Sequence, residues 1–286
     1  MSKIVCWDYG HGSSAELAAS AAICTALMFA GRVLLVNEES AGKGVEAGVG
    51  SRSGSRYAGG STDSASPVAE SGMDALLRLA ANQRLSKGNF QDYTYPAIAG
   101  KLDLVPGFSP EGRQEREIAE RNGSLSLLYS VAEEAYDSVF TRSDASELRE
   151  PERAPYREGK EMHFPVLRQN RLELERFFEE YRERNREITF ADGILLHHYD
   201  PASHWTAGNI KRRFGCKLPI YGIPYSTEFM DAWNNGNILK HIRLSSLIHR
   251  KGKPKDGPLD GLSKFCLGLY EMAGRKPGLL RSEKGA

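Results

Sequence analysis

Residues 3–17, KIVCWDYGHGSSAEL, set the fold class of this 286-residue chain. The first five of these residues are mostly apolar and end at a turn that contains two glycines. An alanine-rich segment at 15–29 follows, and Gly31 suits the end of a helix. Residues 32–36, RVLLV, are almost all apolar, so both faces of that strand must be covered. The order of strand, glycine turn, helix and buried strand predicts a parallel sheet with helices on both faces.

The same alternation continues along the chain. Further helices are predicted at 73–81, 124–135, 171–186, 206–214, 226–234, 238–249 and 262–273. Further strands are predicted at 101–105, 137–141, 162–167, 193–198 and 218–223, with a loop at 142–160. Pro165 is unfavourable in a central strand. The pattern predicts an α/β fold, a doubly wound and mostly parallel sheet of about seven strands. We expect one domain over 1–275, a flexible Gly/Ser-rich insertion at 48–72 and a C-terminal tail at 276–286.

Composition excludes several classes of protein. A formal net charge of +1 gives no reason to expect nucleic acid or an anionic membrane as a partner. The four cysteines are scattered, which favours reduced thiols over a zinc site or disulfides. The longest apolar run, residues 17–30, is shorter than the roughly 20 residues that cross a bilayer. The N-terminus lacks the apolar core of a signal peptide, so we expect a cytoplasmic protein without direct membrane insertion.

Three segments together resemble the MinD/ParA family of P-loop ATPases, including its pilus-assembly branch, the CpaE/TadZ group. KIVCWDYGHGSSAEL, with the next helix and RVLLVNEES, is similar to the first strand, phosphate loop, helix, second strand and first switch. LDLVPG resembles the third strand, and ILLHHYDPASHWTAGNIKRRFG a later strand and helix. LPIYGIPYSTEFMDAWNNGNIL resembles the late strand that ends in Ile-Pro. The resemblance covers residues 3–250, and it implies a P-loop NTPase fold whose adenine side lies at Pro224 and Tyr225.

The phosphate loop departs from this family. A working P-loop surrounds phosphate with glycine N–H groups and adds a Lys and a magnesium-binding Ser or Thr. By resemblance, Gly12 keeps one glycine position, while the last glycine, the Lys and the Ser/Thr positions hold Ala15, Glu16 and Leu17. Exchanging Lys for Glu changes the interaction with phosphate by about 2–8 kcal/mol. A micromolar ligand is held by only about 8 kcal/mol, so the resemblance implies a degenerate Walker A loop.

Other residues of the loop keep some capacity for anions. The family's signature lysine has no counterpart, because Tyr9 or Gly10 stands there. Ser13, Ser14 and the helix N-terminus still offer hydrogen-bond donors and a positive dipole end. For His11, filling the turn is favoured over contacting an anion. Weak binding of ATP or ADP with Mg²⁺ therefore stays open.

The switch positions are also altered. Residues 37–39, Asn-Glu-Glu, stand where the family places acidic residues that handle magnesium, and Glu39 suits either that role or a solvated loop. Arg142 follows the strand at 137–141 where the resemblance implies a magnesium-binding Asp, and Asp144 comes two residues later. A basic residue at that place argues against hydrolysis. Lys43 lies between two glycines and could move toward a phosphate.

The remaining clusters favour structural roles. A metal site from His197, His204 and Asp200 is less favoured than ordinary histidines, because His197 and His198 are consecutive in a strand and should face opposite sides. The basic run 211–213 is interpreted as a solvated face, and the apolar residues of 262–273 as packing on the sheet. No metal ligand and no catalytic residue is predicted.

Two functions remain in view. The first is a non-hydrolysing scaffold or positioning factor, which the resemblance places in a pilus or secretion assembly recruited to the inner membrane face. Its partners would be proteins of that assembly, a second copy included. The second is a slow ATPase switch with a rebuilt phosphate site, using Lys43 or Arg142. An enzyme acting on small molecules has no supporting set of acid, base or nucleophile.

Overall fold

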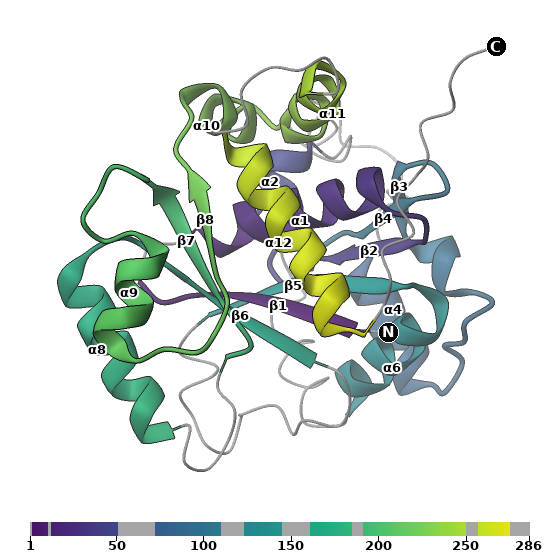
Figure 1. Ribbon diagram of the computed structural model, residues 1–286. Coiled ribbons are helices and arrows are strands. Elements are labelled where there is room, and N and C mark those ends of the chain that lie inside the picture. The colour runs from purple at the N-terminus through teal and green to yellow at the C-terminus, as the bar shows by residue number, and fades with distance from the viewer. Residues whose placement is uncertain are drawn as a thin grey trace.

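The computed structural model describes residues 2–10, 13–50, 72–109, 123–144, 161–184, 191–249 and 257–274. An eight-stranded sheet lies between two layers of helices (Figure 1). The strands are β1 (Ser2–Asp8), β2 (Val33–Val36), β3 (Tyr95–Ile98), β4 (Leu102–Val105), β5 (Ser138–Asp144), β6 (Glu161–Leu167), β7 (Ile194–Tyr199) and β8 (Ile220–Pro224). The helices are α1 (Ser14–Met28), α2 (Glu46–Val49), α4 (Met73–Ala81), η2 (Phe90–Tyr93), α6 (Ser124–Ala135), α8 (Arg171–Arg184), α9 (Ala207–Phe214), α10 (Thr227–Asn234), α11 (Ile238–His249) and α12 (Pro258–Met272). The predicted α/β fold with a mostly parallel, doubly wound sheet is confirmed.

The strand order is β3-β4-β2-β5-β1-β6-β7-β8, and only the β3–β4 pair of this sheet is antiparallel. The sheet has one strand more than the seven that the sequence pattern located, in keeping with the expectation of about seven. The missed strand, β3, is a four-residue edge strand that contains Pro96, and an edge position tolerates proline. β1 lies inside the sheet, with β2 to β5 on one side of it and β6 to β8 on the other. The chain thus changes the direction in which it adds strands at β1. In such folds, ligands bind beyond the carboxyl ends of the strands at this point.

One strand is confirmed and one is longer than expected. The strand predicted at 162–167 is confirmed as β6, which lies between β1 and β7 despite Pro165. Its ladder to β7 involves only Val166 and Leu167, so the missing N–H of the proline interrupts no bond on that side. β5 extends to Asp144, through residues that were predicted as loop. Residues 145–160 of that predicted loop lie outside the described part of the chain.

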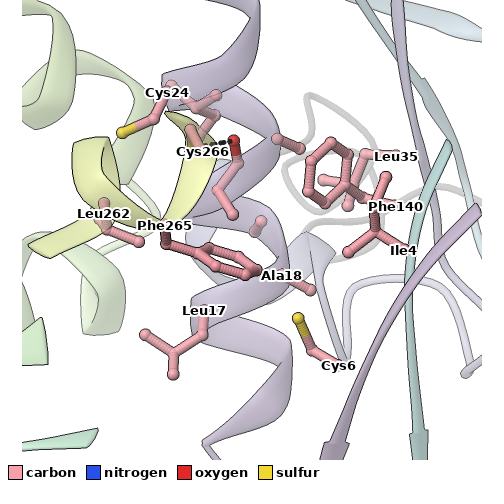
Figure 2. Packing of buried hydrophobic residues seen from close by; sticks show 14 of the residues in the cluster. Ile4, Cys6, Leu17, Ala18, Cys24, Leu35, Phe140, Leu262, Phe265 and Cys266 are labelled. Carbon is pink, nitrogen blue, oxygen red and sulfur yellow. Dashed lines mark hydrogen bonds between the residues drawn. The ribbon is translucent and has the colours of Figure 1, made fainter. Parts of the chain in front are cut away.

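α1 is the central helix of one layer. Small side chains on most of its surface let the sheet, α11 and α12 approach it closely, and Figure 1 shows α12 crossing in front of it. Figure 2 shows Leu17 and Ala18 beside Cys6 of the sheet and Phe265 of α12. Thr25 Oγ1 donates a hydrogen bond to Cys266 Sγ at 3.3 Å. The predicted packing role of the C-terminal helix is thus confirmed.

The opposite face of the sheet is covered by two helix pairs. α4 and α6 pack against β2, β4 and β5, and α8 and α9 pack against β1, β6 and β7. The predicted insertion at 48–72 begins inside α2, where Gly48 and Val49 are buried. Its residues 51–71, and the tail from 275, lie outside the described residues, so the flexibility of the insertion stays a prediction. No helix in the described part of the chain is long and apolar enough to cross a membrane.

An ion cluster joins the starts of β1 and β6, at the end of the sheet opposite the carboxyl ends of its parallel strands. Lys3 Nζ lies 2.9 Å from Glu161 Oε1, and His163 Nε2 lies 3.4 Å from Glu161 Oε2. Burial alone would raise the pKa of Glu161, but His163 and Lys3 outweigh burial and lower this pKa to about 2. The cluster therefore favours the ionised carboxylate.

Candidate functional site

The turn between β1 and α1 carries the predicted phosphate loop, and the carboxylate of Asp8 accepts hydrogen bonds from this loop. The Asp8 carboxylate accepts hydrogen bonds from Ser13 N at 2.6 Å, Ser14 N at 2.9 Å and Ser14 Oγ at 2.6 Å. Asp8, Ser13 and Ser14 are all buried. The first N–H groups of a helix have no partner within the helix and lie at its positive end, which explains why a carboxylate is stable there. The serine donors predicted to meet an external anion are thus used internally.

Other residues of the predicted loop are buried or lie outside the described part of the chain. Ala15 and Leu17 are buried, and Figure 2 shows Leu17 among apolar side chains of the core. The Leu17 side chain is apolar, so it offers no oxygen to a metal ion. Gly10 adopts φ 155°, while His11 and Gly12 lie outside the described residues.

Glu16, which the sequence resemblance aligns with the family's lysine, contacts the end of β7. Its Oε2 lies 3.7 Å from Nε2 of His197, and both side chains are largely buried. His197 Nδ1 is buried without a hydrogen-bond partner among the described residues. The structure thus gives Glu16 a histidine as its neighbour, where a P-loop gives its lysine a phosphate.

His197 and His198 lie on the same side, contrary to the expectation from strand alternation. A bulge in the β7–β8 pairing and a left-handed backbone at His198 (φ 53°) turn the second ring back onto the first. The ring centres are 3.9 Å apart, and the Tyr225 ring meets His198 edge-on at 5.0 Å. Burial, together with the neighbouring His197, lowers the pKa of His198. The pair therefore favours neutral imidazole at His198.

Residues 37–50, which follow β2, fold around a buried glutamate that the sequence analysis missed. Glu46 is 2% exposed and accepts hydrogen bonds from Gly42 N (2.9 Å), Gly107 N (2.5 Å) and Asn37 Nδ2 (2.7 Å). These bonds join the loop to the end of β4. Lys43 is exposed on the same loop, and its side chain has no recorded ion pair within the described residues.

Arg142 connects the switch region to the phosphate loop. Its Nε lies 2.8 Å from Glu39 Oε1, and its Nη1 lies 3.7 Å from Asp8 Oδ2. Glu38, next to Glu39, accepts a hydrogen bond from Thr141 Oγ1 at 2.9 Å and another from Tyr129. Asp144 ends β5 beside Asp8, since these residues are register partners. The predicted switch residues Glu39 and Arg142 therefore meet each other.

The predicted adenine-side turn lies at the end of β8. Pro224 is the last residue of that strand, and Tyr225 is half exposed. Thr227 Oγ1 lies within hydrogen-bond distance of the Tyr225 hydroxyl at 3.3 Å. Through His198, Tyr225 is connected to the Glu16 side of the phosphate loop.

The basic run of α9 lies on another part of the surface. An open hollow of about 490 Å³ is lined there by His204, Trp205, Asn209, Arg212 and Arg213. Both arginines are exposed, as the solvated-face interpretation predicts. His204 belongs to this hollow, and no group of three His, Cys, Asp or Glu side chains in the described ranges is placed to hold a metal.

The structure thus brings together two predicted groups of residues, Ser13 and Ser14 of the loop and Glu39 and Arg142 of the switch. The residue that joins them, Asp8, was missed. The signal present in the sequence was an acidic residue at the end of the first strand. This residue precedes the turn that leads into a helix, whose first N–H groups need a hydrogen-bond acceptor.

Comparisons with known proteins agree on the fold. No protein-family model matches the sequence, and no curated protein matches it. Among solved structures, a ParA family ATPase from Chlorobium tepidum has a TM-score of 0.65 and 17% identity over 93% of this chain and 98% of that chain. The septum site-determining protein MinD from Pyrococcus horikoshii, complexed with Mg-ADP, has a TM-score of 0.58 and 14% identity over 96% and 98%. The MinC:MinD cell division protein complex of Aquifex aeolicus gives 0.56 and 13% over 98% and 99%. This chain therefore has the ParA/MinD-type P-loop fold.

Proposed function

We propose that this chain is a ParA/MinD-fold protein that does not hydrolyse ATP and acts through protein contacts. The observation that carries the proposal is the Asp8 carboxylate on the N–H groups of Ser13 and Ser14. A phosphate that used these donors would have to displace a buried carboxylate whose hydrogen bonds are already satisfied. The degenerate Walker A loop predicted from the sequence is thus a loop with its own internal anion.

The surrounding charges support the same conclusion. Glu16 places a second carboxylate beside the helix start, and Leu17 is fully buried. Two carboxylates repel a polyphosphate by about 1–4 kcal/mol each at contact distance. Arg142, a cation that could offset this repulsion, already contacts Asp8 and Glu39.

For the biological role we propose a scaffold or positioning factor of a pilus or secretion assembly, held at the cytoplasmic face of the inner membrane by its protein partners. The basis is the sequence resemblance to the CpaE/TadZ branch. The MinC:MinD complex shows that this fold can present a surface to another protein. We include a second copy of this chain among the expected partners.

The rival function is a slow ATP switch with a rebuilt site. One observation favours it: Lys43 is exposed on a loop bounded by Gly42 and Gly44, both with positive φ, so its ammonium is free to approach a bound phosphate. In that case ATP or ADP with Mg²⁺ would be the cofactor. The MinD structure from Pyrococcus horikoshii is a complex with Mg-ADP.

The test is to restore the site in steps and follow ATP by calorimetric titration and by phosphate release. We expect no binding for the natural protein and none for Glu16→Lys with Leu17→Thr, because Asp8 still fills the anion position. Adding Asp8→Ala should produce ATP binding that requires Mg²⁺. The matched control is Glu179→Lys with Asp8→Ala, which keeps the change at Asp8 and moves the Glu-to-Lys change to an exposed position on α8, away from the loop. Magnesium-dependent ATP binding by the natural protein would refute the proposal and support the rival.

A further inference from the structure

We propose that a chain of charged contacts, Asp8–Arg142–Glu39, permanently fixes residues 37–50 against α10 and so replaces the conformational role of a nucleotide. This inference rests on the proposed function and extends it to how the protein is regulated. In nucleotide switches, the terminal phosphate orders the switch loops and its loss releases them. In this chain the anion is a side chain and cannot leave.

The first part of the chain of contacts is the arginine between two carboxylates. Arg142 lies on β5, at the register position of Cys6 in β1, and its side chain is only 14% exposed. One carboxylate, Asp8, is itself fixed by three hydrogen bonds from the start of α1. The other, Glu39, belongs to the loop after β2. Both ion pairs are at least partly buried, so salt screens them less than it screens fully exposed pairs.

The second part passes from Glu39 into the loop. Glu39 N donates to Asn37 Oδ1 at 3.2 Å, and its carbonyl oxygen accepts from Phe108 N at 2.8 Å. Asn37 in turn donates to Glu46, the buried residue around which the loop folds. The position of the Glu39 side chain is thus coupled to the backbone of the loop through polar contacts that are mostly buried.

The third part is the contact between α2 and α10. Gly48 lies so close to the ring of Trp233 that an added Cβ would overlap it, and a Cβ at Gly50 would overlap the carbonyl of Gly236. Contact this close exists only when α2 sits in one position, because close-packed surfaces tolerate little sliding. A loop that detached from Arg142 would therefore lose this packing as well. The surface formed by α2 and α10 is presented in a single state.

A second tie, from Glu38 to Thr141 and Tyr129, lies at the base of the same segment. It holds the end of β2 and is independent of Arg142. Breaking the Arg142 contacts should therefore loosen residues 39–50 without unfolding the sheet, which makes the proposal testable in the intact protein.

The experiment is hydrogen–deuterium exchange of the full chain, read by mass spectrometry on peptides covering residues 39–50 and 227–237. Arg142→Gln should raise the exchange of these peptides at least tenfold. Arg176→Gln, an exposed arginine on α8, is the matched control and should leave the exchange unchanged. ATP with Mg²⁺ should have no effect on the natural protein.

A second, more conservative variant and its control keep the proposal testable if the Arg142 variant does not fold. Glu39→Gln removes the same contact from the loop side, and Glu179→Gln on α8 is its control. Exchange that stays equal to the controls in both variants would overturn the charged chain while leaving the proposed function intact. Protection of residues 39–50 by ATP in the natural protein would instead refute the proposed function, because a nucleotide would then set the state of the loop.

Discussion

Replacing Asp8 by alanine tests the internal anion directly. The change removes an acceptor with three hydrogen bonds of 2.6–2.9 Å and leaves Arg142 with Glu39 as its acidic neighbour. Loss of a helix N-terminal acceptor costs about 0.5–2 kcal/mol, and hydrogen bonds to charged groups contribute about 1.5–3 kcal/mol each. Water will reach part of the opened site, so we expect a total loss of about 2–4 kcal/mol in the free energy of unfolding.

The assay is urea and thermal unfolding followed by circular dichroism. For a chain of this size, each kcal/mol lowers the melting temperature by about 2–3 °C, so we expect a fall of roughly 4–12 °C. The control is Asp92→Ala, an exposed acid outside the phosphate loop, which should stay within about 0.5 kcal/mol of the natural protein.

Inorganic phosphate supplies the second readout. The alanine variant frees the donors of Ser13 and Ser14, so about 10 mM phosphate should stabilise it by about 1.4 kcal/mol if the dissociation constant is near 1 mM. The natural protein and the Asp92 variant should not respond. A loss below about 1 kcal/mol, with no response to phosphate, would refute the reasoning.

Three further predictions concern other parts of the chain. The pKa of Glu161 lies below its value in the unfolded chain, so the ionised side chain stabilises the folded protein above about pH 4.5. This stabilisation is lost as the pH falls toward 2, by at most about 1.4 kcal/mol per pH unit. Glu161→Gln should flatten that part of the acid unfolding profile, and an unchanged profile would contradict the role of the ion cluster. Gly48→Ala should cost about 1–3 kcal/mol by overlap with Trp233, and a double variant with Trp233→Ala should show positive coupling in denaturant titrations. Burial raises the pKa of all four thiols, but only Cys216 is partly exposed. Alkylation of the folded protein, followed by mass spectrometry, should therefore label Cys216 first. Earlier labelling of another cysteine would contradict the packing.

Elements with a strong local pattern were predictable from the sequence. The helices α4 and α6 begin and end where the apolar spacing indicates, and the buried strands β2 and β4 are within one residue of their predicted bounds. β3 gave no such signal, because a short edge strand with Pro96 is stabilised by pairing with β4 and not by its own composition. The neighbouring positions of His197 and His198 depend on a bulge, which no alternation rule contains.

The candidate site was predictable only in part. That Glu16 and Leu17 stand at altered positions is what the family resemblance implies, and it can be stated from the sequence because the phosphate loop is local in sequence. The contact of Arg142 with Asp8 depends on the register of β5 against β1, which joins residues more than 130 positions apart in the chain. Long-range pairing of this kind is set by packing, so a single sequence carries little trace of it.

The most direct test of the central claim, that the phosphate loop holds its own anion and takes no nucleotide, is thermal unfolding of the natural protein with millimolar ATP and Mg²⁺, with ADP as the control. A nucleotide at about 100 times its dissociation constant would add roughly 2.7 kcal/mol, which raises the melting temperature by several degrees. The structure predicts no change with either nucleotide. A rise that requires Mg²⁺ would contradict the claim, because it would show that the natural protein binds the nucleotide.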